Sequence, residues 1–222
     1  MRRKNHIEFD LLGNAQDSLR QAVELLANRE GEKGNEHGRL KHSITSSAHC
    51  IELLLKERLR RIHPAFVWEK VDSYPNLEAR TVTVDTAITR LKAVGGITFT
   101  SADEERLRSL RKTRNAIEHY EWRAEEKEAK VIVGNALSFA FSFASAELGI
   151  DLAAPFKGDD TWQDLLDEFY EFVIAHGRRL ESKLAKQGSF SVCCDECGHL
   201  TVPIDGGSCE LCGHWQYIDE EP

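Results

Sequence analysis

Apolar residues recur at spacings of three and four along most of the first 187 residues, and the alternation typical of strands is scarce there. The first stripe consists of Ile7, Leu11, Leu12, Ala15, Leu19, Ala22, Val23 and Leu26. The second stops before Pro64 and consists of Ile44, Ala48, Ile51, Leu55, Leu59 and Ile62. Only a short Gly-rich, charged segment separates them, so the two stripes predict an antiparallel helical hairpin.

The next stretch predicts irregular chain and then a short helix. Residues 64–83 contain two Pro, three aromatic residues and the sequence TVTV, which favour an irregular segment with a short extended piece. A short helix is predicted from about Asp85 to Val94, because Gly95 and Gly96 follow as a stop signal.

Three longer helices are predicted in the second half of the chain. Ser101 and Glu104 match a capping box, and the helix that they begin runs into the sequence TRNAIEHYEW at residues 113–122. The other two cover residues 124–148 and residues 160 or 161 to about 186. Together with the hairpin, these elements predict an all-α helical bundle.

The character of the sequence changes after Gln187 and Gly188, where Cys, Gly and alternating apolar residues replace the helical period. We therefore predict a helical domain at residues 1–187 and a small C-terminal domain at residues 188–222. A chain of 222 residues has room for one good core and a small appendage. A content of 41% apolar and 30% charged residues is typical of a soluble globular protein.

Four of the six cysteines lie in the sequences CDECGH and CELCGHW. Cys194, Cys197, Cys209 and Cys212 form two Cys-x-x-Cys-Gly turns separated by eleven residues. This spacing predicts a structural zinc ion, and four protein ligands leave no open position for catalysis. Two disulfides or a redox site are the alternative, which a cytosolic chain disfavours. The sequence around the cysteines resembles a zinc ribbon, with HLTVPI and WQYI as its strands.

Residues beside these turns leave two points open. Cys193 adjoins Cys194, and His199 and His214 each follow a turn, so one of the three can replace a cysteine ligand. The aromatic side chains of His199, Trp215 and Tyr217 can stack on a base or pack on the helices, and packing is the commoner outcome. Cys50 lies alone in an apolar stripe and is predicted to be a core residue.

Charge is shared unevenly between the two predicted domains. Residues 188–222 hold seven acids and no Lys or Arg, whereas the first 187 residues hold 29 basic and 30 acidic residues. The acidic C-terminal domain is therefore a poor match for phosphate and a better match for a protein partner. The near-neutral helical domain does not exclude binding to a polyanion.

One segment has the length of a membrane span. Residues 131–150 are nearly uncharged, but they are rich in Ala and Ser and poor in Leu and Ile, which favours a buried helix of a soluble protein. Charged residues recur through the first thirty positions, where no apolar secretory segment is found. We expect a cytoplasmic protein that does not cross a membrane.

Placed on a regular helix, residues 107–122 separate into two faces. The apolar face holds Leu110, Ile117 and Tyr120, and the basic face holds Arg108, Arg111, Lys112, Asn115, His119 and Trp122. Asn115 and His119 are four residues apart and therefore adjacent. Arg114 lies about 140° around the helix from His119. Its stem wraps back, the helix bends there, or Arg114 serves a site that a second protomer completes.

Arg114, Asn115 and, after three residues, His119 resemble the signature of the HEPN domain family, in which an Arg and a polar residue precede a His. The helical pattern fits this family's antiparallel bundle, and SSAHCIELLLKERL is similar to its second helix. The resemblance covers about residues 1–187. It implies a homodimeric, metal-independent endoribonuclease, and many members of the family act as toxins, which suggests a toxin or a phage-defence effector.

The resemblance also implies roles for individual residues. Two copies of His119 would meet across a dimer, one as base for the RNA 2′-OH and one as acid for the leaving 5′-oxygen. Arg114 would hold the phosphate, and Asn115 would orient His119 or donate to a phosphate oxygen. Some relatives are silenced by modification of a Tyr one residue beyond the His, whereas here Tyr120 follows His119 directly. Further contacts with the RNA backbone are expected from Arg108, Arg111 and Lys112.

The main alternative is a dimeric adaptor without catalytic activity. In it the helical domain binds RNA or a nucleotide, and the acidic zinc ribbon docks a protein partner. His119 would then only hydrogen-bond Asn115 or lie in solvent. The two functions differ in geometry, because a nuclease needs Arg114 and His119 at an open cleft.

Overall fold

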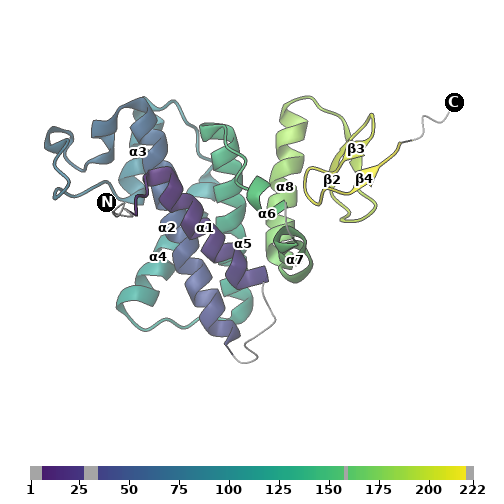
Figure 1. Cartoon of the computed structure of the whole chain (residues 1–222), viewed down its shortest axis with the longest axis horizontal. Helices are drawn as coiled ribbons and strands as arrows, with labels where there is room; N and C mark the ends of the chain where they lie inside the picture. The colour runs from purple at the N-terminus through teal and green to yellow at the C-terminus, as the bar shows by residue number, and fades with distance from the viewer. Residues whose placement is uncertain (1–6, 28–34, 158–159, 219–222) are drawn as a thin grey trace, which may run out of the picture.

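Helices dominate the computed structural model of the protein, which describes residues 7–27, 35–157 and 160–218 (Figure 1). The helices form one bundle, and four short strands follow at its C-terminal side. The predicted fold class, an all-α bundle with a small C-terminal strand region that carries a cysteine cluster, is therefore confirmed.

The first two helices form the predicted hairpin. α1 (Leu11–Ala27) lies along α2 (Glu36–Ile62), which ends before Pro64 as expected. Buried Ser43 of α2 donates its hydroxyl to the carbonyl oxygen of Ala22 at 3.0 Å, so a polar side chain joins the two helices inside the core. Ile7 is exposed, and α1 therefore begins later than the apolar stripe predicts.

The segment after α2 is irregular, as predicted. It contains two short 3₁₀ turns, η1 (Pro64–Val67) and η2 (Val71–Ser73), and a single antiparallel bridge between Trp68 and Thr81. The bridge is the extended piece that the TVTV sequence predicts. α3 (Val84–Val94) follows, capped by the Thr83 hydroxyl.

α4 (Ser101–His119) begins one residue away from the predicted cap. The Thr100 hydroxyl, not that of Ser101, accepts a hydrogen bond from the Asp103 N–H at 3.1 Å. The predicted capping box of Ser101 and Glu104 is therefore wrong. Thr and Ser are both good N-cap residues, so the sequence alone did not separate two neighbouring candidates.

α5 (Glu126–Phe143) lies in the middle of the bundle and continues as a π-helical turn, η3 (Ala144–Leu148). Glu126–Leu148 has the length and composition of a membrane span, the one such helix in the described part of the chain. Most of it is buried inside the protein, with Val133, Leu137 and Ala140 fully covered. The prediction that this segment is a buried helix is therefore confirmed.

The predicted last helix is interrupted. α6 (Ala154–Lys157) and α7 (Thr161–Glu168) precede α8 (Tyr170–Lys186), and between the last two the Phe169 backbone leaves the helical region at φ −124° and ψ 73°. Phe169 is buried, and the break lets both helices direct aromatic side chains into the core. A single helix up to residue 186 is therefore wrong.

α5 and α8 touch through their backbones. A Cβ atom at Gly134 would lie 2.8 Å from the carbonyl carbon of Glu171 and 2.9 Å from the nitrogen of Phe172. A side chain at this position would push the helices apart, because neither neighbour is a flexible side-chain end. Gly134 therefore sets how closely α8 approaches the bundle.

The strands form two antiparallel pairs. β1 (Ser191–Cys193) pairs with β2 (Leu200–Pro203), and β3 (Gly207–Ser208) pairs with β4 (Trp215–Gln216). β2 and β4 confirm the strands predicted in HLTVPI and WQYI, whereas β1 and β3 were not predicted. We call residues 191–218 the strand unit and α1 to α8 the helical body.

The strand unit rests on α7 and α8 (Figure 1). The indole N–H of Trp162 in α7 donates to the carbonyl oxygen of Leu211 at 3.0 Å, and both residues are buried. The ring of His199 lies against Gly177 of α8, where any side chain would clash with it. A hydrogen bond and a close glycine contact thus attach the strand unit to the helices.

Candidate functional site

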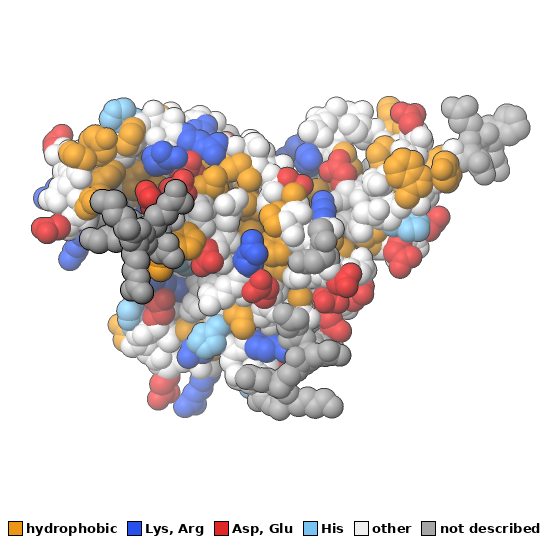
Figure 2. Space-filling view, in the orientation of Figure 1, with side chains coloured by type: hydrophobic (Ala, Val, Ile, Leu, Met, Phe, Trp, Pro, Cys, Tyr) orange, Lys and Arg blue, Asp and Glu red, His pale blue; other side chains and the backbone are white. Residues whose placement is uncertain are grey.

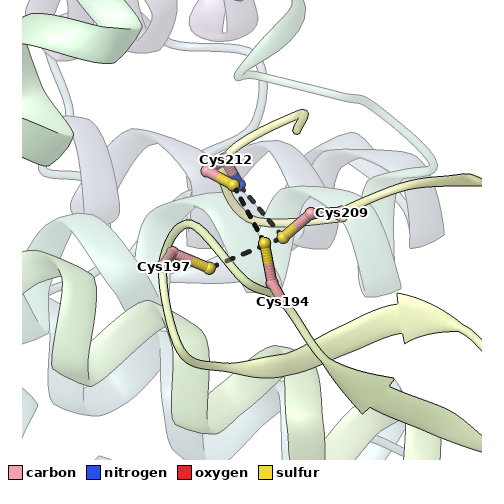
Figure 3. Close-up of side chains that lie close together, drawn as sticks. All are labelled: Cys194, Cys197, Cys209 and Cys212. Atoms are coloured by element: carbon pink, nitrogen blue, oxygen red, sulfur yellow. Dashed lines mark hydrogen bonds between the residues drawn. The ribbon is translucent and has the colours of Figure 1, made fainter. Parts of the chain in front are cut away.

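The four predicted cysteine ligands meet in the strand unit (Figure 3). Cys194 and Cys197 lie in the turn between β1 and β2, and Cys209 and Cys212 lie in the turn between β3 and β4. All four Sγ atoms lie within 4.8 Å of one another. The predicted cluster is therefore confirmed as a group that can hold a metal ion.

Both turns have the geometry that the Cys-x-x-Cys-Gly sequence predicts. The N–H of Gly198 donates to the carbonyl oxygen of Cys194 at 2.8 Å, and that of Gly213 donates to Cys209 at 2.9 Å. Both glycines have left-handed backbones, with φ of 73° and 78°. A side chain is strained in this conformation, so glycine permits each turn.

Burial disfavours the thiolate form of these cysteines. Burial raises the pKa of Cys197 to about 11, and the sulfur of Cys209 adds to the rise. At Cys209 burial also raises the pKa, but hydrogen bonds from the Cys212 N–H and the Thr201 hydroxyl outweigh it and lower the pKa overall. Since neighbouring thiolates repel one another, a positive ion is needed for all four to ionise.

The three alternative ligands lie outside the cluster. Cys193 is exposed, and its sulfur faces the carbonyl oxygen of Gly198 at 3.3 Å. The Nδ1 atom of His199 lies 2.9 Å from a carboxylate oxygen of Glu181 in α8, which fixes the ring away from the sulfurs. His214 is exposed and takes no part in the cluster.

The aromatic side chains of the strand unit differ in their packing. His199 packs on α8 as predicted. Trp215 and Tyr217 are exposed and contact each other edge to face, with ring centroids 6.2 Å apart. The prediction that Trp215 and Tyr217 pack on the helices is therefore wrong, because β4 lies on the side of the strand unit away from α8 (Figure 1).

The residues of the Arg-Asn-His motif occupy the last two turns of α4. Arg114 donates from Nη1 to Oδ1 of Asn115 at 3.3 Å. Glu118 lies close to both Arg114 and His119. One of its carboxylate oxygens is 2.8 Å from Arg114 Nε and 3.9 Å from His119 Nε2. The His119 side chain is 62% exposed. Arg114 therefore pairs with Glu118, the residue before His119, and not with His119 itself.

The predicted basic strip is only partly free. Arg111 forms an ion pair with Asp85 at the start of α3, whereas Arg108 and Lys112 are exposed. Arg111, Arg114 and Asn115 also line a cavity of about 390 Å³. His119 is not among the residues that line it, so a single chain does not bring Arg114 and His119 to one cleft.

The end of α4 alters the predicted faces. Leu110 is buried and Ile117 packs on the core, as expected. Tyr120 is 80% exposed, and Trp122 packs on the core instead of facing solvent. Both assignments were wrong because the helix ends at His119 and Tyr120 is extended, so helical spacing no longer applies.

The buried cysteine outside the strand unit is a core residue, as predicted. Cys50 of α2 is fully covered, and burial raises the pKa of its thiol to about 12. It therefore stays protonated and inert at neutral pH.

Comparison of the chain with protein-family models, with curated proteins and with solved structures found no match.

Proposed function

We propose that the protein is a metal-independent endoribonuclease of the HEPN type, with a site that forms between two copies of the chain. The observation that supports this function best is the placement of Arg114, Asn115 and His119 on the exposed C-terminal end of α4, with Arg114 and His119 both next to Glu118. Solvent access to the imidazole is what a group that transfers protons to a large substrate requires.

The chemistry uses the ribose as nucleophile. One copy of His119 takes the proton from the RNA 2′-OH, and the copy from the second chain gives a proton to the leaving 5′-oxygen. The bond from phosphorus to the 5′-oxygen breaks as the bond to the 2′-oxygen forms. The products are therefore a 2′,3′-cyclic phosphate and a 5′-OH.

The other motif residues stabilise charge. Arg114 binds the phosphate oxygens, on which charge builds in the transition state, and Glu118 holds its guanidinium until RNA arrives. Asn115 donates to the phosphate or orients its neighbours. Arg108 and Lys112 are exposed for contact with the RNA backbone, whereas Arg111 must first leave Asp85.

We assign zinc to the cysteine cluster, in a structural role. Four sulfurs around a zinc ion at about 2.3 Å would be about 3.8 Å apart. The Sγ atoms of Cys194 and Cys212 are 3.6 Å apart, and those of Cys197 and Cys209 are 3.7 Å apart. Thiolate donors also favour zinc over the hard cations Mg²⁺ and Ca²⁺. Metal analysis of the purified protein should find one zinc ion per chain.

The central experiment measures cleavage with EDTA in the buffer, on RNA and on the same strand with 2′-deoxy positions. Only the RNA should be cut. His119→Ala should reduce the rate by about 10²- to 10⁴-fold, because general acid-base groups contribute on this scale. His42→Ala is the matched control, since His42 is an exposed histidine of α2 outside the motif. Equal cutting of both strands would refute this mechanism.

A mixing experiment tests the shared site. If two His119 side chains act in one dimer, equal amounts of wild-type and His119→Ala chains, once exchanged, should retain about one quarter of the activity. Independent sites would retain about half. A strictly monomeric protein in ultracentrifugation would also contradict the shared site.

A non-catalytic adaptor is the second candidate, and the exposed Trp215–Tyr217 pair on the acidic strand unit favours it. Such a pair suits a protein partner, because aromatic residues are enriched at interfaces. An adaptor would bind RNA without cutting it, and His119→Ala would leave its binding unchanged.

A further inference from the structure

A long groove runs along α8, beside the places where this helix packs on α4 and α5. It has a volume of about 1270 Å³ and is lined by residues of α4, α5 and α8. The surface dips between the bundle and the part that α8 and the strands form (Figure 2). Lining residues occur along the whole of α8, from Tyr170 to Lys186, a length of about 25 Å. This length exceeds that of one small ligand and suits an extended chain.

The groove is positive on a negative protein. The chain has a net charge of −8, yet the groove has an excess of three positive charges. Its acids are Asp103, Asp151, Glu171 and Glu210. Its cations are Arg106, Lys127, Lys157, Arg178, Arg179, Lys183 and Lys186. A groove with this imbalance attracts a polyanion against the repulsion of the whole molecule.

Part of this positive charge is not neutralised. Arg179 pairs with Asp103, and Lys183 lies 3.3 Å from Glu210. Lys127, Arg178 and Lys186 are exposed and form no ion pair in the parts of the chain that the structure describes, and Arg178 has a weaker electrostatic contact with Glu181, whose pKa it helps to lower. These three cations remain available to phosphate groups.

The groove also offers aromatic and polar surface. Tyr170 lines it at the start of α8 with 70% of its surface exposed, so the face of its ring is open to a ligand. His176 lies in the groove wall, and its buried Nδ1 atom has no hydrogen-bond partner among the described residues. The groove wall thus contains a buried polar atom without a hydrogen-bond partner. The exposed ring of Tyr170 can stack on a planar group.

We infer that this groove binds a single-stranded RNA segment, with phosphates at Lys127, Arg178 and Lys186 and a base stacked on Tyr170. Positive grooves with exposed aromatic rings are the common way to bind single strands. The inference extends the proposed nuclease function, because Lys127 follows His119 by eight residues, at the start of the next helix. The groove touches α4 at Asp103 and Arg106, and Lys127 is the lining residue nearest to His119 in the sequence.

The test measures binding separately from cleavage. A fluorescent 12-nucleotide single-stranded RNA is titrated with the intact chain carrying His119→Ala, which prevents cutting, and anisotropy is recorded between low and high salt. The combined Lys127→Glu, Arg178→Glu and Lys186→Glu variant should lower the salt slope of log K by about 2, because each phosphate contact on a single strand contributes roughly 0.7. Thermal melting verifies that each variant is folded.

A matched control keeps the change in net charge the same. Arg20→Glu, Lys41→Glu and Lys70→Glu also replace three exposed cations, but these residues lie outside the groove. This variant should keep the salt slope of the parent protein. Equal loss of binding in both variants would show a general charge effect and would overturn the inference.

The stacking contact has its own pair of variants. Tyr170→Ala should weaken binding about tenfold, the scale of one base stacked on an aromatic ring. Tyr217→Ala removes a tyrosine that is 84% exposed on the strand unit and should have no effect. A blunt RNA duplex that binds as tightly as the single strand would also overturn the inference.

The outcomes separate this inference from the proposed activity. If the wild-type protein binds RNA through the groove but cuts no RNA, the proposed nuclease activity is refuted and RNA binding in the groove is supported. If cleavage depends on His119 but the groove variants bind RNA as tightly as the parent protein, the nuclease activity is supported and RNA binding in the groove is refuted.

Discussion

In the helical body a single apolar cluster extends from α1 to α8, and many of its members are fully covered. In the strand unit the buried cluster contains only Val202 and Leu211 besides two of the cysteines. A unit of this size does not bury enough apolar surface to fold alone. The body is therefore stabilised by burial, whereas the strand unit depends on its sulfurs and on contact with α7 and α8.

The largest effect on this difference is expected when the cysteine cluster is removed. Cys194→Ser with Cys209→Ser, or a strong chelator under reducing conditions, should unfold the strand unit and leave the body folded. The structural zinc ion that we propose for this cluster would supply on the order of 10 to 16 kcal/mol. The helical circular-dichroism signal should persist, while amide NMR signals of residues 191–218 lose their dispersion. Cys193→Ser is the control and should change neither. If the helices unfold together with the strands, the two regions are not stabilised independently, and the difference proposed here is wrong.

A change inside the body should have the opposite pattern. Leu55→Ala removes a fully covered side chain of α2 and should cost about 2 to 5 kcal/mol of unfolding free energy. The metal content should not change. Denaturant unfolding measures the loss, and Leu77→Ala, at an exposed position, is the control that should cost little.

The contact between α4 and α8 is tested through pH. Burial raises the pKa of Asp103, but the hydrogen bond and charge of Arg179 outweigh it and lower the pKa below its usual 3.8. The carboxylate therefore stabilises the fold at neutral pH, and this contribution is lost as pH falls below about 3.8. Asp103→Asn should cost roughly 1.5 to 3 kcal/mol at pH 7.

Melting curves of wild-type and Asp103→Asn protein should converge as the pH is lowered through this range. The Asp164→Asn variant changes an exposed acid of α7 and is the control. A difference between Asp103→Asn and the wild type that is independent of pH would assign the effect to packing instead of charge.

The smallest predicted effect concerns the hydrogen bond between the two regions. Trp162→Phe keeps an aromatic ring but removes the N–H that donates to Leu211, at a cost of about 1 kcal/mol. The strand unit should release its metal more readily in a chelator competition. Trp215→Phe changes an exposed ring and should leave the release rate unaltered.

Much of this architecture follows from local patterns in the sequence. Helical stripes predicted α1, α2 and α5, and the spacing of Cys194, Cys197, Cys209 and Cys212 predicted the cluster, because both depend on residues close in the chain. The alternative ligand His199 was excluded only by Glu181, which lies on a different element and is not visible as a local pattern.

Errors arose where tertiary contacts decide the outcome. The apolar period continues through Phe169, so nothing local marks the break that lets α7 and α8 pack separately. Tyr120 and Trp122 were assigned by a helical period that ends at His119. The groove along α8 was missed as well, because Lys127 and Arg178 come from helices far apart in the sequence.

Gly134 has a consequence for engineering. Because its missing side chain lets two backbones touch, one added methyl group would act as a spacer between α5 and α8. The strand unit is attached to α8, so it would be displaced with that helix. Gly134→Ala thus offers a way to change the width of the groove along α8 without altering any of its charges.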